Sequence, residues 1–319
     1  MDGRPHRSLR ALVPLLLLLG LLAGCATPQP VLELRRDPGG LPPKTELANV
    51  PFFPQEDLWC GPAAIAMVLA WSGLPVTQEE MAAQVYTPGR QGTLQTDILA
   101  GARRNGRLAV EVRDLRALLT ELAAGNPVLV FQNLGLASIP QWHYAVATGY
   151  ELDPASNLIL HSGLDPRRVT PLGTFERTWA RADHWALVVT GPDRLPATAA
   201  LEPALGAALG IERAGRVPDA ATAYETIAAR WPESFGAWMG LGNTRFALKD
   251  PAAAERAFRK AAEADPTAPQ AWNNLAYALA EQGRRAEAIA AAERAVALGG
   301  ANADPYRATL QELSQAPSS

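Results

Sequence analysis

The sequence predicts an α+β domain followed by an all-α helical solenoid. Over residues 47–192, segments with helical patterns come first and apolar runs that suit strands follow. The composition then shifts to alanine, glutamate and arginine, and Trp238 is followed by Trp272 after 34 residues. Helices before antiparallel strands are typical of an α+β domain, and a fixed period of this length is typical of a helical repeat array.

The N-terminus has the pattern of an export signal. Three arginines among the first ten residues precede the apolar run ALVPLLLLLGLLA, which is short for a permanent bilayer span. The run ends in LAGC, which resembles the bacterial lipoprotein signal, and the resemblance implies a lipidated Cys25 behind a signal peptide over 1–24. The alternative is an ordinary signal peptide. Ala26, which is not aspartate, favours by family analogy an outer-membrane lipoprotein that faces the periplasm.

Two segments have the composition of connections between folded parts. Residues 25–46 are rich in proline, glycine and charge, so we expect a tether there. The stretch GPDRLPATAALEPA carries three prolines, and we place a linker at 193–201. The predicted domains are therefore 47–192 and 202–300, with a C-terminal tail over 301–319.

Four helices and then strands are expected in the first domain. AAIAMVLAW is a helix that opens behind Gly61 and Pro62, since proline suits a first helical turn. TQEEMAAQVY is a second helix, with Thr77 and Glu80 spaced for a capping box. GTLQTDILAGARRNG and VRDLRALLTELAAGN are the third and fourth helices. The expected strands are PVLVFQNL, HYAVATGYEL, NLILHSG and DHWALVVTG.

The second half repeats with a period of 34 residues, and its pattern resembles the tetratricopeptide repeat. One repeat carries the full pattern, at Trp238, Leu241, Gly242, Ala254, Phe258, Ala261 and Pro266. Weaker copies precede and follow it, so we expect three repeats over 202–300. The resemblance implies a docking surface for a protein partner. The alternative is that the repeats only pack against the first domain.

Cys60 is the second of two cysteines in the chain, so it has no disulfide partner if Cys25 is lipidated. A lone thiol in an oxidising compartment is either buried and inert or used in chemistry. The predicted helix start would place this thiol where the helix dipole favours a thiolate. His143 opens a predicted strand and could act as a base, or could be structural. Gln55 and the Cys60 backbone N–H could donate hydrogen bonds to a developing oxyanion.

The order of these residues, with CGPA at the cysteine and HY at the histidine, resembles papain-like bacterial cysteine peptidases, which include the leader-processing domains of bacteriocin exporters. The stretch PFFPQEDLWCGPAAIAMVL carries the closest match. The resemblance implies that Cys60 is the nucleophile, His143 the general base and acid, and Gln55 an oxyanion donor. It also implies peptide-bond hydrolysis through a thioester.

The third catalytic position departs from that family, in which an aspartate followed by proline lies on the next strand. In NLILHSG, His161 stands at the expected place. A neutral imidazole could orient His143 but could not stabilise an imidazolium as a carboxylate does. Asp165 and Asp153 flank this strand and are alternatives, as is the absence of a third member.

The remaining features exclude several function classes. A net charge of −3 gives no support for nucleic-acid binding. No phosphate-binding glycine motif and no zinc-ligand spacing occurs, so we expect no cofactor and no metal, and we expect His184 to support the fold. The sequence predicts a lipid-anchored cysteine peptidase with peptide or protein substrates, anchored to the membrane through lipid on Cys25. The alternatives are a catalytically degenerate peptide-binding scaffold and acyl transfer in place of hydrolysis.

Overall fold

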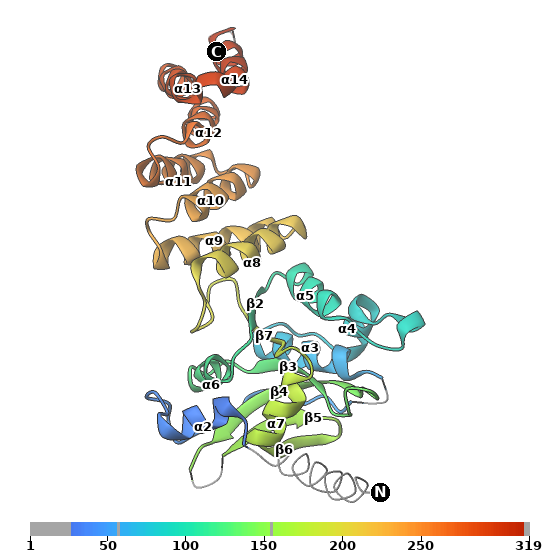
Figure 1. The fold of residues 1–319 in the computed structure, drawn as a ribbon. Helices are drawn as coiled ribbons and strands as arrows, with labels where there is room; N and C mark the ends of the chain where they lie inside the picture. Colours follow the sequence, from blue (N-terminus) through green and yellow to red (C-terminus); the bar gives the residue numbers. More distant parts are fainter. Residues whose placement is uncertain (1–26, 56–57, 154–155, 316–319) are drawn as a thin grey trace, which may run out of the picture.

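A computed structural model describes residues 27–55, 58–153 and 156–315. It consists of a domain built on a β-sheet and a stack of paired helices that extends away from it (Figure 1). The predicted signal peptide over 1–24 and the lipidation site at Cys25 lie outside the described residues. Within the described part of the chain, no helix has the length and apolar character needed to span a membrane.

One antiparallel sheet with the strand order β2-β7-β3-β4-β5-β6 forms the centre of the first domain, and β1 pairs with β4. The strands are β1 (Lys44–Glu46), β2 (Leu108–Val112), β3 (Val128–Asn133), β4 (Trp142–Glu151), β5 (Asn157–Ser162), β6 (Asp165–Pro171) and β7 (Ala186–Thr190). The helices of this domain are α2 (Gln29–Arg36), α3 (Cys60–Trp71), α4 (Gln78–Val85), α5 (Gln95–Arg104), α6 (Leu115–Ala123) and α7 (Leu172–Ala180). The expected α+β class is confirmed.

Both faces of the sheet are buried, and the pleat of β4 divides its side chains between two cores. Tyr144 and Val146 pack in the core beneath α3, whereas Ala145 and Ala147 pack in the core that includes residues of α6 and α7. Successive residues of a strand point to opposite faces, so neighbours along β4 meet different helices. This alternation also decides which residues of β5 can reach the candidate site.

The helix α3 forms because it is apolar on every side and is covered on every side. All nine residues from Gly61 to Leu69 are buried. A Cβ atom on Gly61 would lie 2.6 Å from Cβ of Thr93, so only glycine lets the segment before α5 approach the first turn of α3. The predicted capping box of α4 is present, with Thr77 Oγ1 accepting from the Glu80 amide at 3.2 Å and Glu80 Oε2 accepting from the Thr77 amide at 2.9 Å.

Within the described residues, the segment expected to be a tether is folded from Gln29 onward, which corrects that expectation. Val31 and Leu34 of α2 are buried in the same core as α6 and α7, and β1 pairs with β4. The spacing of Val31 and Leu34 places both side chains on one face of a helix. The prolines and charged residues of this segment made its two-residue apolar face difficult to recognise in the sequence.

Sequence reasoning also missed three elements of the first domain. β2 is short, and its burial comes from pairing with β7 and from packing against α8 and the two cores of the sheet domain. β6 is almost wholly exposed, so it has no apolar alternation to reveal it. α7 follows directly from β6, and its apolar residues become a core face only when it covers the sheet, where Phe175 and Trp179 are fully buried.

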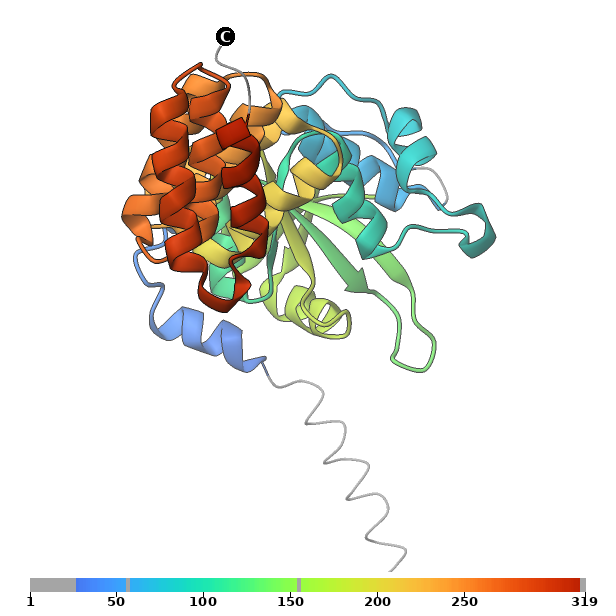
Figure 2. The same cartoon turned by 90° about the horizontal axis from the view of Figure 1, so that it is seen from above.

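Three pairs of antiparallel helices form the stack, as the repeat pattern predicts. They are α8 (Leu201–Arg213) with α9 (Val217–Arg230), α10 (Phe235–Ala247) with α11 (Pro251–Ala264), and α12 (Pro269–Ala280) with α13 (Arg285–Gly299). Figure 2 shows the molecule from above, where these helices overlap one another in the view. A Cβ on Gly242 would lie 2.3 Å from the Phe258 ring, so the glycine of the W-x2-L-G pattern is what lets α10 and α11 approach.

A further helix follows where a tail was expected. α14 (Asp304–Gln315) packs on α13 and buries Leu313, and the Tyr277 hydroxyl of α12 lies 3.1 Å from Thr309 Oγ1. The last helix pair has an apolar face with no next repeat to cover it, and α14 covers that face.

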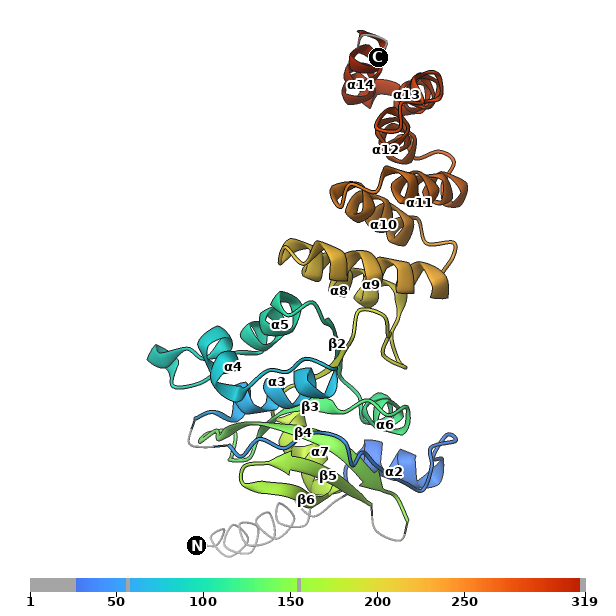
Figure 3. The same cartoon turned by 180° about the vertical axis from the view of Figure 1, so that it is seen from behind.

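The stack and the sheet domain share a core. Leu108 and Val110 of β2 belong to the same apolar cluster as residues of α8 and α9, and Figure 3 shows α8 lying next to β2. The segment before α8 is fixed by Glu121, which is fully buried. Its carboxylate accepts hydrogen bonds from the Thr198 amide at 2.6 Å, the Thr198 hydroxyl at 2.5 Å, the Ala197 amide at 3.1 Å and the Asn126 amide group at 2.6 Å.

Candidate active site

A cleft of about 780 Å³ opens between the start of α3, the start of β4 and the segment that precedes α5. Its walls are formed by Gln55, Leu58, Cys60, Arg90, Gln91, Gly92, Thr93, Leu94, Gln95, Phe131, Trp142, His143, Tyr144 and Gly163. Three of the four residues predicted to act in catalysis, Cys60, His143 and Gln55, therefore line one cavity. His161 does not line it.

Cys60 is a free, partly buried thiol at the first position of α3. The residue before it, Trp59, supplies no side-chain cap to the helix. Burial raises the pKa of the Cys60 thiol, and backbone N–H groups of Tyr144, Gly61 and Cys60 itself oppose this only in part. The sequence predicts a helix start that favours a thiolate, but burial is the largest influence on the Cys60 pKa and keeps the resting thiol protonated.

His143 is held by a serine. Its Nε2 lies 2.8 Å from Oγ of Ser162, the last residue of β5. Burial lowers the pKa of His143 to about 4, and the charge of Arg168 adds to this shift. The ring is therefore neutral near pH 7. Because Ser162 engages Nε2, Nδ1 is the ring nitrogen left to exchange a proton with a group in the cleft.

The prediction that His161 orients His143 is wrong. Nδ1 of His161 contacts the Pro166 carbonyl oxygen at 2.5 Å, and its Nε2 contacts the Val50 carbonyl oxygen at 3.1 Å. The pairing of β4 with β5 places His161 opposite Val146, on the α3 face of the sheet. A shift of one residue moves a side chain to the other face, so the orienting position falls to Ser162.

Neither of the alternative carboxylates, Asp165 and Asp153, takes the position that orients His143. Asp165 accepts a hydrogen bond from the Arg167 amide at 2.9 Å, which is the ordinary role of an aspartate in a turn. Asp153 lies in the β4–β5 connection. It borders a separate cavity, which residues of α2 also line. Among the described residues, no hydrogen bond joins a carboxylate to His143.

Gln55 is buried and held in one orientation. Its backbone N–H donates to the Gly163 carbonyl at 3.0 Å, and its side-chain Oε1 accepts from the Gly163 N–H at 3.0 Å. With Oε1 fixed, the orientation of Nε2 is fixed as well. Nε2 is buried and has no hydrogen-bond partner among the described residues. A buried amide donor without a partner is rare, and here it borders the cavity that also holds Cys60.

Aromatic side chains form one wall of the cleft. Trp142 stacks on Phe131 with ring centroids 5.2 Å apart and remains 53% exposed. The Tyr144 hydroxyl donates to the Thr93 carbonyl at 3.1 Å, which ties β4 to the opposite wall. The cleft is therefore apolar on one side and bounded on the other by the segment that carries Arg90.

His184 lies outside this cleft, as the prediction of a supporting role requires, and contacts Glu176. In the described ranges 27–55, 58–153 and 156–315, no cluster of three or more histidine, cysteine, aspartate or glutamate side chains is arranged to hold a metal ion.

Both domains match models of known protein families. Residues 47–186 match the model of the Peptidase_C39 like family, and residues 205–269 and 242–303 match the Tetratricopeptide repeat model. The chain therefore contains a Peptidase_C39-like domain followed by tetratricopeptide repeats, as the sequence predicted.

Solved structures show limited similarity to this chain. The type III secretion translocator chaperone SycD of Yersinia enterocolitica is 23% identical, with 36% of this chain and 78% of that chain covered and a TM-score of 0.33. The TPR2B domain of yeast Sti1, solved as a pHsp70 complex, is 22% identical, with 36% of this chain and 96% of that chain covered and a TM-score of 0.35. A search of curated proteins gave no match.

Proposed function

We propose that the first domain is a cysteine peptidase that hydrolyses peptide bonds through a thioester on Cys60. The observation that carries the proposal is the convergence of Cys60, His143 and the unpartnered Gln55 Nε2 on one cleft. The three come from the start of α3, the start of β4 and the segment before α3, so the fold and not the local sequence brings them together.

The protonation states of the resting site define the first step. A protonated thiol and a neutral imidazole favour general-base attack: His143 takes the thiol proton as sulfur bonds to the substrate carbonyl carbon. The carbonyl oxygen, now negative, accepts from Gln55 Nε2 and the Cys60 N–H. The imidazolium then gives its proton to the departing amine, which leaves a thioester. Water, deprotonated by His143, attacks this thioester, and the thiol regains its proton.

The Ser162 hydroxyl can orient His143 but carries no charge to stabilise the imidazolium. We therefore expect a slower reaction than a carboxylate would support. The same observation favours a second candidate function, a peptide-binding scaffold in which the cleft retains its shape and has lost its chemistry. In that case Gln55 Nε2 would donate to a bound peptide carbonyl without bond cleavage.

The deciding experiment measures cleavage and binding on the same peptides. A degenerate peptide pool is incubated with the wild type and with C60A, and cleavage is read by mass spectrometry. H184A is the matched control, since it removes a partly buried histidine outside the cleft. Cleavage lost in C60A and retained in H184A supports the peptidase. Retention of cleavage in C60A rejects it. Peptides bound equally by both proteins, with no cleavage by either, support the scaffold.

We further propose that the repeats bind a protein partner. A groove of about 550 Å³ lies on the second helix pair, and Trp238 and Leu241 supply apolar contacts there. Its charged side chains are Glu225, Arg245, Asp250, Arg256, Arg259, Lys260 and Glu263. A test compares partner capture by the wild type and W238A, with L164A as a control at an exposed apolar residue outside the groove and outside the cleft. Equal capture by W238A would contradict the proposal.

We also propose that lipid on Cys25 anchors the protein to the periplasmic face of the outer membrane. The LAGC tetrad behind the apolar run supports this. C25S is expected to move the protein from the membrane to the soluble fraction, with C60S as the matched cysteine control. A C25S protein that still sediments with membranes would reject the anchor.

A further inference from the structure

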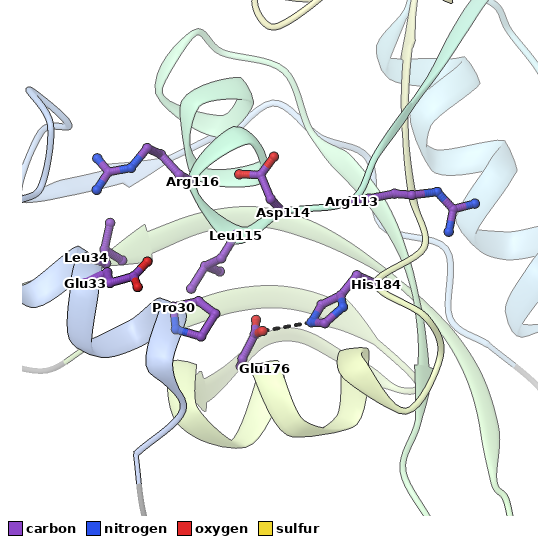
Figure 4. Close-up of a pocket in the computed structure, with 9 residues that line it drawn as sticks. All are labelled: Pro30, Glu33, Leu34, Arg113, Asp114, Leu115, Arg116, Glu176 and His184. Atoms are coloured by element: carbon purple, nitrogen blue, oxygen red, sulfur yellow. Dashed lines mark hydrogen bonds and ion pairs between the residues drawn. The ribbon is translucent and has the colours of Figure 1, made fainter.

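A second cavity lies between α2, α6 and α7 and shares no residue with the candidate active site. It has a volume of about 340 Å³. Its walls are Pro30, Glu33, Leu34, Arg113, Asp114, Leu115, Arg116, Glu176 and His184 (Figure 4). Neither the sequence motifs nor the proposed peptidase chemistry uses this cavity.

The polar group of interest in this cavity is the carboxylate of Glu176, a residue that is only 4% exposed. Its Oε1 lies 2.8 Å from Nε2 of His184. Its Oε2 is buried and has no hydrogen-bond partner among the described residues. Figure 4 shows the carboxylate pointing up from α7 into the space below Leu115. A buried carboxylate oxygen is costly without a donor, so this position calls for a ligand that donates hydrogen bonds.

The site is built to hold that carboxylate still. The His184 ring meets the Trp179 ring edge-on, with centroids 4.9 Å apart, and Trp179 Nε1 donates to the Trp185 carbonyl at 2.9 Å. Arg113 donates to the carbonyl of Asp183 at 3.1 Å and to its carboxylate at 3.0 Å, which fixes the turn before His184. Packing and hydrogen bonds therefore set the direction of both members of the Glu176–His184 pair.

The two arginines that line this cavity form hydrogen bonds with groups other than Glu176. Arg113 also donates to Glu111 Oε2 at 2.7 Å, and Arg116 donates to the Asp37 carbonyl at 2.6 Å. Figure 4 shows both guanidinium groups pointing away from Glu176. Among the described residues, neither of these guanidinium groups pairs with the Glu176 carboxylate.

The rest of the wall is apolar or acidic. Pro30, Leu34 and Leu115 supply apolar surface, and Glu33 brings a second carboxylate from α2. A buried acceptor beside the apolar surface of Pro30, Leu34 and Leu115 is complementary to a cationic head group on an alkyl stem.

We propose that this cavity binds an alkylammonium group. The ammonium donates to Glu176 Oε2, the His184 ring continues to hold Oε1, and the alkyl stem lies against Leu34 and Leu115. Because the ligand touches α2, α6 and α7 together, binding stabilises the packing of α2 on the sheet domain. The inference does not rest on the proposed peptidase activity.

The test titrates the full chain with n-butylammonium chloride and follows the ring proton signals of His184 by NMR. The chain has four histidines, so the H184Q variant assigns the signal. Butan-1-ol is the neutral isostere, and sodium chloride controls for ionic strength. We expect a saturable shift with the ammonium and none with the alcohol. The melting temperature should rise with ammonium concentration, since a ligand that binds only the folded state stabilises it.

Variants decide whether Glu176 is the acceptor. E176Q keeps the shape and removes the charge, and affinity should fall by about tenfold or more. E233Q, an exposed carboxylate in the turn before α10, should bind as the wild type does. If E176Q does not fold, E176D is used instead. It retains the charge on a side chain that is shorter by one methylene, and it should also bind the ammonium more weakly. No saturable shift, an equal response to butan-1-ol, or unchanged affinity in a folded Glu176 variant would overturn the proposal.

A second probe identifies the source of the ammonium. Nα-acetyl-lysine amide presents the same group on a capped residue. Binding of both probes supports a lysine side chain from a peptide or protein. Binding of n-butylammonium alone supports a small free amine, and binding of neither overturns the inference.

Discussion

His143 Nε2 lies 2.8 Å from Ser162 Oγ, so a hydroxyl and not a carboxylate orients the imidazole that borders the cleft. This contact connects the pairing of β4 and β5 with the chemistry proposed for the site. The strand register gives the orienting position to Ser162, and the absence of a negative charge there leaves burial as the main influence on the His143 pKa.

Substitution of Ser162 tests this relationship. S162A removes one neutral hydrogen bond, so peptide cleavage should fall by about two- to tenfold. S162D supplies a carboxylate, which should raise the His143 pKa and increase cleavage. Both are measured as kcat/KM against pH on a cleaved peptide. H161Q is the matched neighbour and should leave the pH profile unchanged per folded molecule. A pH profile that moves in H161Q and not in S162D would show that the register assignment is wrong.

Alkylation of Cys60 tests the protonation state of the thiol. In a C25S background Cys60 is the only cysteine. Because burial raises its pKa, iodoacetamide labelling should be slow near pH 7 and should reach its midpoint above the ordinary thiol value of about 8.5. H143A should leave labelling at pH 5 as slow as in the parent protein. Rapid labelling that persists to pH 5 and disappears in H143A would instead reveal a thiolate–imidazolium pair.

Acid stability tests the burial of His143. The folded-state pKa is about 4, below the usual value of about 6.5, so between these values the unfolded chain binds a proton that the folded chain does not. The contribution of neutral His143 is therefore present above about pH 6.5 and is lost as the pH falls toward 4. H143Q should show a flatter decline of the unfolding free energy over this window, measured by urea titration at several pH values. Parallel curves for H143Q and the wild type would contradict the prediction.

Glycine substitutions test the helix contacts of the repeats. G242A places a Cβ 2.3 Å from the Phe258 ring and should destabilise the protein by about 1 to 3 kcal/mol. G206A is the matched control in α8, where a Cβ meets nothing within 4 Å. It should be neutral or stabilising by up to about 1 kcal/mol, since alanine is the better helix former. Chemical denaturation measures both, and equal effects of the two substitutions would mean that the glycine contact is not what matters.

Removal of the Glu121 carboxylate tests the connection between the two domains. E121A leaves the Thr198 and Ala197 amides without their acceptor and should cost about 2 to 4 kcal/mol. The segment over 193–200 should then become a site of limited proteolysis. E79Q, an exposed position in α4, serves as the control. Resistance of this segment to protease in E121A would show that the shared core, and not the carboxylate, fixes the linker.

Local sequence determined the elements whose causes lie within a few residues. A short window of sequence is enough to predict an element when it contains a local pattern that recurs in many proteins. Such patterns here are the capping box of Thr77 and Glu80, the apolar run of α3 and the glycine at position 242. The spacing of Gln55 and Cys60 could be recognised for the same reason. α14 and α2 were missed because each depends on an apolar face that only a neighbouring helix makes useful.

The tertiary structure decided the rest, because the deciding quantities depend on which segments meet. The strand register places Ser162, and not His161, within hydrogen-bond distance of His143. A shift of one residue would exchange the two faces of the sheet. Burial raises the pKa of Cys60, and that burial depends on the segments from other parts of the chain that cover the thiol. The sequence by itself determined the residue types available for chemistry, and only the folded chain determined which atoms face one another and in which protonation state.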